Sequence, residues 1–188
     1  DQNNEINYKD TTMYRFLKNF KPKSISHFVN SDDPLPIFTY PWGTFKKNES
    51  KTTKKREFSR FCGPSTDEFI KEEFNRTIKL YNKICKEGYK PWSNYNRHIG
   101  GTFLIKKNGL KKFIVLQGNH RMAILSHLGY SESISIRNIK GYKFKIFEKN
   151  LKNWPLVKIN ECTEKHALEI FNLYFKENGS HIKKMLYS

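Results

Sequence analysis

A chain of 188 residues, 37% of them hydrophobic and 15% aromatic, is long enough to bury a core and is not typical of a disordered protein. Lys and Arg outnumber Asp and Glu by 35 to 18, a net charge of +17, which predicts either an anionic partner or only a solvated basic surface. Three widely separated cysteines argue against a disulfide framework or a zinc site, and no window is apolar enough for a membrane span, so we expect a cytoplasmic protein.

Residues 1–60 are predicted to form an N-terminal arm and a basic loop. A short helix is expected around Thr12–Phe20, and three prolines between positions 34 and 41 favour an extended arm after it. Residues 46–60 then carry seven basic and two acidic side chains with almost nothing apolar. Such a run predicts a solvated loop, and a flap that orders over phosphate is the alternative.

An amphipathic helix is predicted from about residue 66 to residue 87. Ser65–Glu68 has the spacing of a capping box, and the helix should end at Gly88 because Pro91 cannot continue it. The apolar residues that recur at steps of three and four are Phe69, Ile70, Phe74, Ile78, Tyr81 and Ile84.

A β-hairpin is expected next. Thr102–Lys106 and Lys112–Gln117 are apolar runs on either side of a turn around Lys107–Gly109, and Asn-Gly is a strong hairpin signal. The polar loop before them contains Arg97, His98 and the pair Gly100-Gly101. A paired glycine before a strand favours a simple turn, and a second phosphate-approaching loop formed with Thr102 is the alternative.

The most informative stretch follows the hairpin. An apolar run from Phe113 to Leu116 meets Gly118, and an apolar-patterned helix then closes at Gly129, which predicts a strand, a tight turn and a helix. Glycine lets another group approach the backbone, and the first amides of a helix favour an anion. With the imidazole of His120 and the guanidinium of Arg121 added, this turn predicts a phosphate site, and a structural salt bridge is the alternative for the arginine.

The remainder of the chain completes an α/β (α+β) fold, with a small mixed sheet flanked by helices. Strands are expected at Ser133–Asn138 and Lys143–Phe147, a turn at Trp154-Pro155, and a last helix that Thr163 caps and that ends before Gly179. We therefore predict a nucleotide-binding core over residues 61–150, with residues 151–188 as a C-terminal helical extension packed on it.

Gln117-Gly-Asn-His-Arg121, followed by an apolar helix and a closing Leu-Gly-Tyr130, resembles the Asp-Gly-His-His-Arg or Gly-Glu-Arg-Arg turn of the ParB and sulfiredoxin-like superfamily. The similarity covers about residues 60–140 and includes the helix that ends in Gly88-Tyr-Lys-Pro91, as in the ParB N-terminal domain. The resemblance implies a ParB/sulfiredoxin-like fold. It also implies that Gly118, Asn119, His120 and Arg121 hold the phosphates of ATP or another nucleoside triphosphate, with Mg²⁺ as the bridging ion.

Members of this superfamily bind and hydrolyse CTP, phosphorylate free serine, or repair oxidised cysteine with ATP. Asn119 stands where sulfiredoxins have their reactive cysteine, and Gln117 stands where one version of the turn has an acidic residue. We therefore expect a nucleotide-binding phosphotransferase or nucleotide hydrolase, most simply a kinase acting on a small hydroxyl-bearing molecule.

In that scheme His120 and Arg121 are the catalytic residues, and Gly100, Gly101 and Thr102 assist in nucleotide binding. Residues assigned to the acceptor are Arg60, Arg97 and His98. The general base stays open among Asp67, Glu68 and Glu72, and no metal ligand is assigned. Two alternatives remain: a ParB-like nucleic-acid-binding module, such as a nuclease or a CTP-dependent switch that uses loop 46–60, and a non-catalytic anion-sensing relative.

Overall fold

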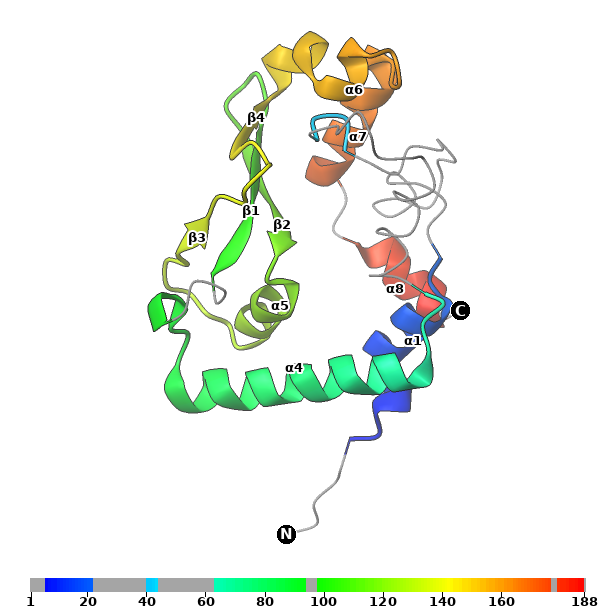
Figure 1. Ribbon diagram of the computed structural model, residues 1–188, viewed down its shortest axis with the longest axis vertical. Helices are drawn as coiled ribbons and strands as arrows, with labels where there is room; N and C mark the ends of the chain where they lie inside the picture. The colour runs from blue at the N-terminus through cyan, green and yellow to red at the C-terminus, as the bar shows by residue number, and fades with distance from the viewer. Residues whose placement is uncertain (1–5, 22–39, 44–62, 94–97, 177–178, 188) are drawn as a thin grey trace. The chain divides into compact units, whose positions relative to one another are not determined.

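The computed structural model describes residues 6–21, 40–43, 63–93, 98–176 and 179–187 (Figure 1). By its internal contacts the chain divides into two compact units. The first contains Asp1–Tyr40, Phe45–Arg76 and Asn172–Ser188, and the second contains Pro41–Thr44 and Thr77–Phe171. No helix within the described ranges combines the length and the hydrophobicity needed to cross a bilayer.

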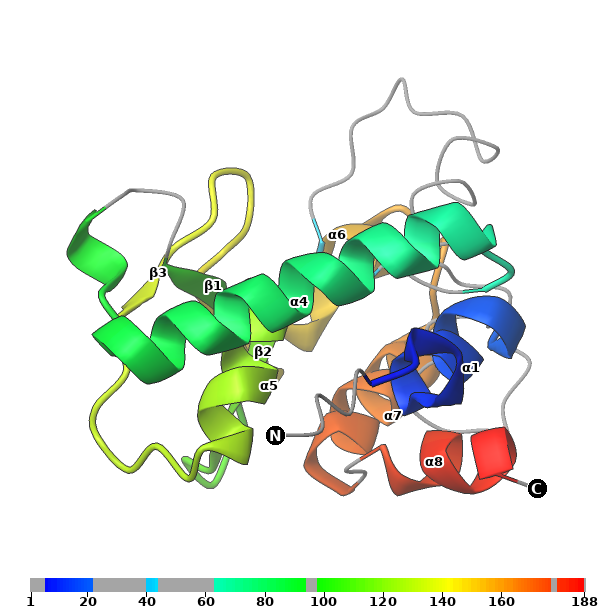
Figure 2. The same cartoon turned by 90° about the horizontal axis from the view of Figure 1, so that it is seen from below.

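The described part of the first unit is helical. α1 (Thr12–Asn19), predicted from the sequence, begins at Thr11, whose hydroxyl accepts a hydrogen bond from the Tyr14 amide at 3.1 Å. α8 (Ser180–Tyr187) follows Gly179 and was not predicted. Helices α1 and α8 lie side by side in Figures 1 and 2, and the guanidinium carbon of Arg15 lies 4.5 Å from the centre of the Tyr187 ring.

The long helix α4 (Asp67–Glu87) confirms the predicted amphipathic helix. Its cap is one residue later than the predicted box, because the Thr66 hydroxyl accepts from the Phe69 amide at 3.3 Å. The Ser65 amide donates instead to the carbonyl oxygen of Leu17 at 2.9 Å. The helix ends at Gly88, whose φ of +74° suits glycine.

The second unit contains a small four-stranded mixed sheet, which confirms the predicted α/β content. β1 (Ile99–Ile105) pairs antiparallel with β2 (Lys111–Gln117), and the predicted hairpin turn has Gly109 at a φ of +86°. β3 (Ile136–Arg137) and β4 (Lys145–Phe147) pair in parallel with β1, both on the side away from β2 (Figure 1). Both are shorter than the strands predicted there.

Three further helices follow β2 in the sequence. α5 (Asn119–His127) follows β2 directly, and α7 (Glu164–Lys176) is the predicted helix capped by Thr163, whose hydroxyl accepts from the His166 amide at 3.2 Å. The predicted turn at Trp154-Pro155 is instead the start of α6 (Pro155–Lys158), because proline fits the first helical position, where no amide is needed. Short 3-10 helices occur at Tyr8–Asp10, Pro91–Ser93 and Glu148–Asn153.

Two apolar clusters hold the second unit together. Ile84 of α4, Ile99 of β1, and Ile124 and Leu125 of α5 form one buried cluster, which fixes α5 against the sheet. The second cluster is aromatic: the rings of Trp42, Trp154 and Phe171 lie 5.3 to 5.9 Å apart, and the two tryptophans are 5% and 3% exposed.

Asp67, at the start of α4, forms ion pairs with two lysines of the first unit. An Asp67 carboxylate oxygen lies 2.6 Å from the Lys18 ammonium, the other lies 3.5 Å from the Lys9 ammonium, and the Tyr14 hydroxyl donates to the carboxylate at 3.3 Å. The hydrogen bond from Lys18 is the main cause that lowers the pKa of Asp67 below its usual value.

We predict that this cluster makes the stability of the protein dependent on acid pH. The folded pKa of Asp67 is below the unfolded value of about 3.9, so its contribution is full above that value and is lost as the pH falls through the folded pKa. Asp67→Asn should therefore lower the free energy of unfolding at pH 7, measured by urea unfolding, and the difference from wild type should shrink by pH 3. An equal difference at both pH values would contradict this account.

Candidate functional site

The predicted strand, tight turn and helix are confirmed at Gly118. β2 ends at Gln117, Gly118 has φ +86° and ψ 27°, and α5 begins at Asn119. The first hydrogen bond inside the helix runs from the Met122 amide to the Gly118 carbonyl oxygen at 3.0 Å. The amides of residues 119–121 therefore lie in the first turn, where the helix itself supplies no acceptor and its dipole favours negative charge.

Gly118 also lies very close to the beginning of β1. A Cβ atom added there would be 3.3 Å from the Ile99 Cα and 3.4 Å from the His98 carbonyl oxygen. The positive φ and this close approach both favour glycine. The turn is thus held against β1, with the backbone of His98 beside it.

A second arginine reaches the turn from β3. Arg137 Nη2 donates a hydrogen bond of 2.7 Å to Gln117 Oε1. Gly100 of β1 pairs with Gln117 on one side and with Arg137 on the other, so the sheet register brings these two residues together. Sequence reasoning missed Arg137, because nothing in the local pattern of residues 133–138 distinguishes it.

Gly100, Gly101 and Thr102 lie within β1, so both the simple turn that the glycine pair favours and the alternative, a phosphate-approaching loop, are wrong. All three are buried, and the Thr102 hydroxyl donates to the Lys143 carbonyl oxygen at 2.6 Å. A Cβ at Gly101 would lie 2.0 Å from the Ile114 carbonyl oxygen and 2.6 Å from the Phe113 ring. Close packing between β1 and β2 therefore explains the glycine.

His120 and Arg121 occupy the first turn of α5 and are partly buried. Arg121 lines a small pocket of about 60 Å³ at the end of α4. Burial raises the pKa of the neighbouring Tyr89 phenol, and a hydrogen bond with the Ile99 backbone and the positive charge of Arg121 oppose part of that rise. The other residues of this pocket are Leu80, Lys83, Ile84, Glu87, Gly88 and Lys90.

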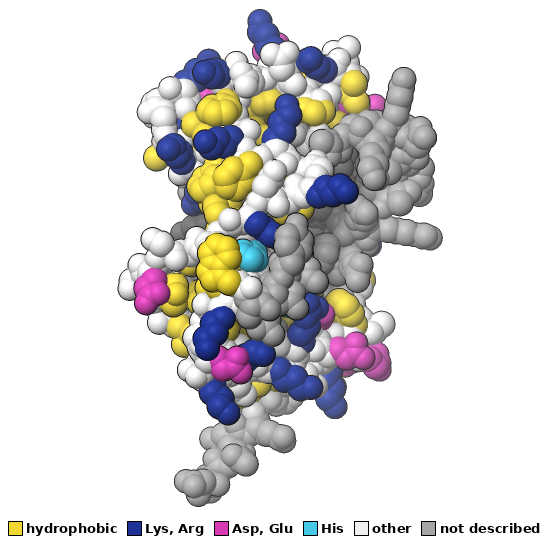
Figure 3. Space-filling view, turned by 60° about the vertical axis from the view of Figure 1, so that its left-hand side comes forward, with side chains coloured by type: hydrophobic (Ala, Val, Ile, Leu, Met, Phe, Trp, Pro, Cys, Tyr) yellow, Lys and Arg dark blue, Asp and Glu magenta, His cyan; other side chains and the backbone are white. Residues whose placement is uncertain are grey.

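Of the predicted acceptor-binding residues, the structure describes only His98. Its ring lies 5.2 Å from the ring of Trp92 at an interplanar angle of 82°. Arg60, Arg97 and the basic loop 46–60 lie outside the described residues. Figure 3 shows Lys and Arg side chains spread over the visible face of the described chain, with isolated Asp and Glu among them.

A protein-held Mg²⁺ does not fit the turn. Gln117 carries an amide where a carboxylate would serve as a ligand, and its side-chain oxygen accepts from Arg137. Within the part of the chain that the structure describes, no group of three or more His, Cys, Asp and Glu side chains could hold a metal ion.

Comparison with protein-family models, with curated proteins and with solved structures finds no match to this chain.

We predict that the contact between Gly118 and β1 stabilises the fold. Gly109 has the same φ of +86°, but nothing lies within 4 Å of an added Cβ, so it is a matched control. Gly109→Ala should lower the free energy of unfolding by about 1–2 kcal/mol because of its φ. Gly118→Ala should cost about 1 kcal/mol more, because its Cβ also meets Ile99. If urea unfolding shows that both variants lose the same free energy of unfolding, the contact between Gly118 and β1 does not contribute to stability.

Proposed function

We propose that the turn Gln117–Arg121 binds the phosphates of a nucleoside triphosphate, and that the protein transfers the terminal phosphoryl group to a small hydroxyl-bearing molecule or to water. The observation that carries this proposal is the glycine-hinged junction of β2 and α5, with Gly118 at φ +86° at the N-terminus of a nine-residue helix. Such a junction presents backbone N–H groups and a positive dipole end to one point. The resemblance to the ParB and sulfiredoxin-like superfamily supports the same role, and we propose that the chain has the fold of that superfamily.

The basic side chains around the junction suit a phosphate group. A guanidinium can donate two parallel hydrogen bonds to phosphate oxygens, and Arg121 lies in the same helical turn as the amides. Arg137 is held next to the turn through its 2.7 Å hydrogen bond to Gln117. These groups would counter the negative charge that spreads over the phosphoryl oxygens in the transition state, and His120 would add a further donor.

The Mg²⁺ that the resemblance implies would reach this site as part of the nucleotide complex. Magnesium commonly keeps several waters and is held largely by substrate phosphates. The described residues at the turn supply no carboxylate ligand for the ion, so the nucleotide phosphates would hold it. Of the three candidate general bases, Asp67 is paired with Lys18 and Lys9, which leaves Glu68 and Glu72 as candidates.

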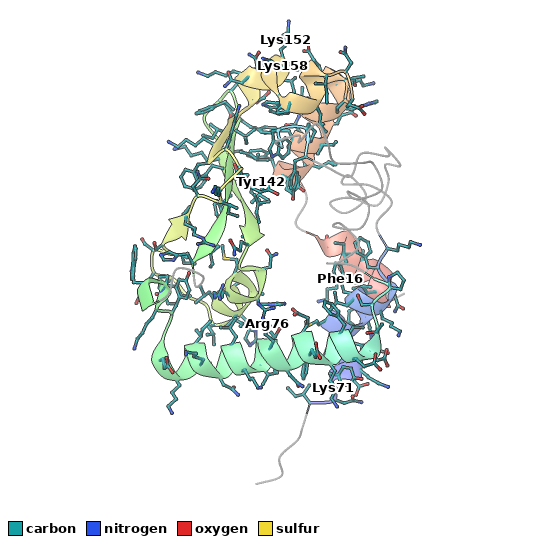
Figure 4. All side chains as sticks on the ribbon, in the orientation of Figure 1. Phe16, Lys71, Arg76, Tyr142, Lys152 and Lys158 are labelled. Carbon is teal, nitrogen blue, oxygen red and sulfur yellow. The ribbon has the colours of Figure 1, made fainter. Side chains whose placement is uncertain are left out.

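Removing Arg121 should abolish most nucleotide binding. Arg121→Ala is expected to weaken binding of the Mg²⁺ complexes of ATP, CTP and GTP by about 10- to 150-fold, because a hydrogen bond to a charged group contributes about 1.5–3 kcal/mol. Arg76→Ala is the matched control: this exposed arginine of α4 (Figure 4) pairs with Glu73 at 3.1 Å. Calorimetric titration at two salt concentrations measures both variants.

The same titrations distinguish the proposed function from a second candidate, nucleic-acid binding. The net charge of +17 favours a nucleic-acid-binding module, whose affinity should fall steeply with salt and be nearly independent of sequence. Binding of DNA or RNA with that salt dependence, together with no binding of any nucleotide, would replace the proposal. Nucleotide binding without turnover in an acceptor screen would identify the non-catalytic, anion-sensing relative.

A further inference from the structure

A pocket of about 640 Å³ lies in the second unit, and the phosphate-binding role proposed above does not use it. Its volume is within the range of small-molecule sites. Aromatic side chains and groups able to donate or accept hydrogen bonds line it together: Tyr89, Lys90, Pro91, Trp92, Tyr130, Glu132, Ser133 and Ser135.

The aromatic residues of this pocket offer a flat apolar surface to solvent. Trp92 is 78% exposed, whereas Trp42 and Trp154 are almost completely buried. The rings of Tyr89 and Tyr130 meet edge to face at 6.4 Å, which fixes both against each other. An indole held at the rim of a pocket is well suited to stack on a planar ring, since aromatic stacking tolerates any flat π-system.

The polar groups of the pocket include both hydrogen-bond acceptors and donors. Glu132 Oε2 accepts from the Tyr130 hydroxyl at 2.8 Å, which orients that carboxylate, and Lys90 supplies an ammonium. Two serine hydroxyls, at positions 133 and 135, can do either. A planar ligand with donors and acceptors on its edge, such as a nucleobase, matches this lining better than a purely apolar ring.

Two observations connect this pocket to the turn at Gly118. Tyr89 and Lys90 line both the pocket and the smaller cavity that contains Arg121. The Trp92 ring also lies 5.2 Å from the His98 ring, and the carbonyl oxygen of His98 lies against Gly118. The aromatic pocket and the phosphate-binding turn are therefore neighbours on the same unit.

We infer that this pocket holds the base of the nucleotide whose phosphates bind at the Gly118 turn, with the base stacked on Trp92. The inference rests on the proposed function and adds to it a second half of the same site. Affinity should then come from two separable parts: the phosphates at Arg121 and the base at Trp92.

The test compares two probes on three proteins. The probes are inorganic triphosphate and whichever of ATP, CTP and GTP binds the wild type most tightly, both with Mg²⁺; the proteins are wild type, Trp92→Ala and Arg121→Ala. Trp92→Ala should weaken nucleotide binding by about 5- to 150-fold and leave triphosphate binding unchanged. Arg121→Ala should weaken both probes. Trp92→Phe, which keeps a stacking ring, should retain most of the nucleotide affinity.

A matched control is Tyr142→Ala, because Tyr142 is 43% exposed and is not among the pocket-lining residues (Figure 4). Bound nucleotide should also reduce the quenching of wild-type tryptophan fluorescence by acrylamide, since Trp92 is the exposed indole among the tryptophans the structure describes.

If Trp92→Ala binds nucleotide as wild type does while Arg121→Ala does not, the base pocket is wrong and the phosphate site stands. If neither probe binds the wild type, the proposed function fails, and the inference fails with it.

Discussion

The packing of Gly118 against the first residues of β1 is the constraint on which the candidate site depends. Gly118 lies so close to β1 that an added Cβ would be 3.3 Å from the Ile99 Cα and 3.4 Å from the His98 carbonyl oxygen. A larger residue would push the turn outward and move the first turn of α5 with it. The direction of the helix amides, and so the place where an anion would bind, therefore depends on the small size of Gly118.

β1 extends this constraint to the rest of the sheet. Gly100 is the residue that pairs with both Gln117 and Arg137, so the central strand aligns two side chains that are far apart in the sequence. Ile139 comes close on one face, where a Cβ at Gly100 would lie 2.7 Å from its side chain. The paired glycines thus allow β2 and the segment after β3 to approach β1 closely. This close approach places an arginine beside the turn.

The features that the sequence predicts correctly are encoded in a few consecutive residues. Gly88 ends α4, Asn108-Gly109 forms the hairpin turn, and Gly118 joins a strand to a helix. Local patterns cannot reveal a parallel register between β1 and a strand of two residues, so Arg137 was not identified. The same limit explains Gly100-Gly101: a glycine pair favours a turn locally, but its neighbours Phe113, Ile114 and Ile139 come from other segments.

The exposed tryptophan illustrates a different limit of sequence reasoning. A single Trp in a proline-containing segment gives no periodic signal, so the sequence does not distinguish Trp92 from Trp42 and Trp154. Two of them do fill the aromatic core, where their rings contact Phe171. Trp92 differs because the 3-10 helix Pro91–Ser93 follows the end of α4 and holds the indole at the rim of a pocket. Its environment depends on where Tyr89 and Tyr130 meet, which is a tertiary contact.

Gln117 affects both the phosphate binding and the proton transfer that are proposed for the turn. A carboxylate in its place would pair with Arg137 and cancel that positive charge, whereas the amide oxygen accepts the 2.7 Å hydrogen bond and leaves the guanidinium charge in the site. If phosphate binds at the turn as proposed, the neutral side chain would strengthen the attraction of the turn for it. An amide is also too weak a base to take a proton from an acceptor hydroxyl. In the proposed reaction, the residue that would favour phosphate binding therefore leaves proton abstraction to a different group.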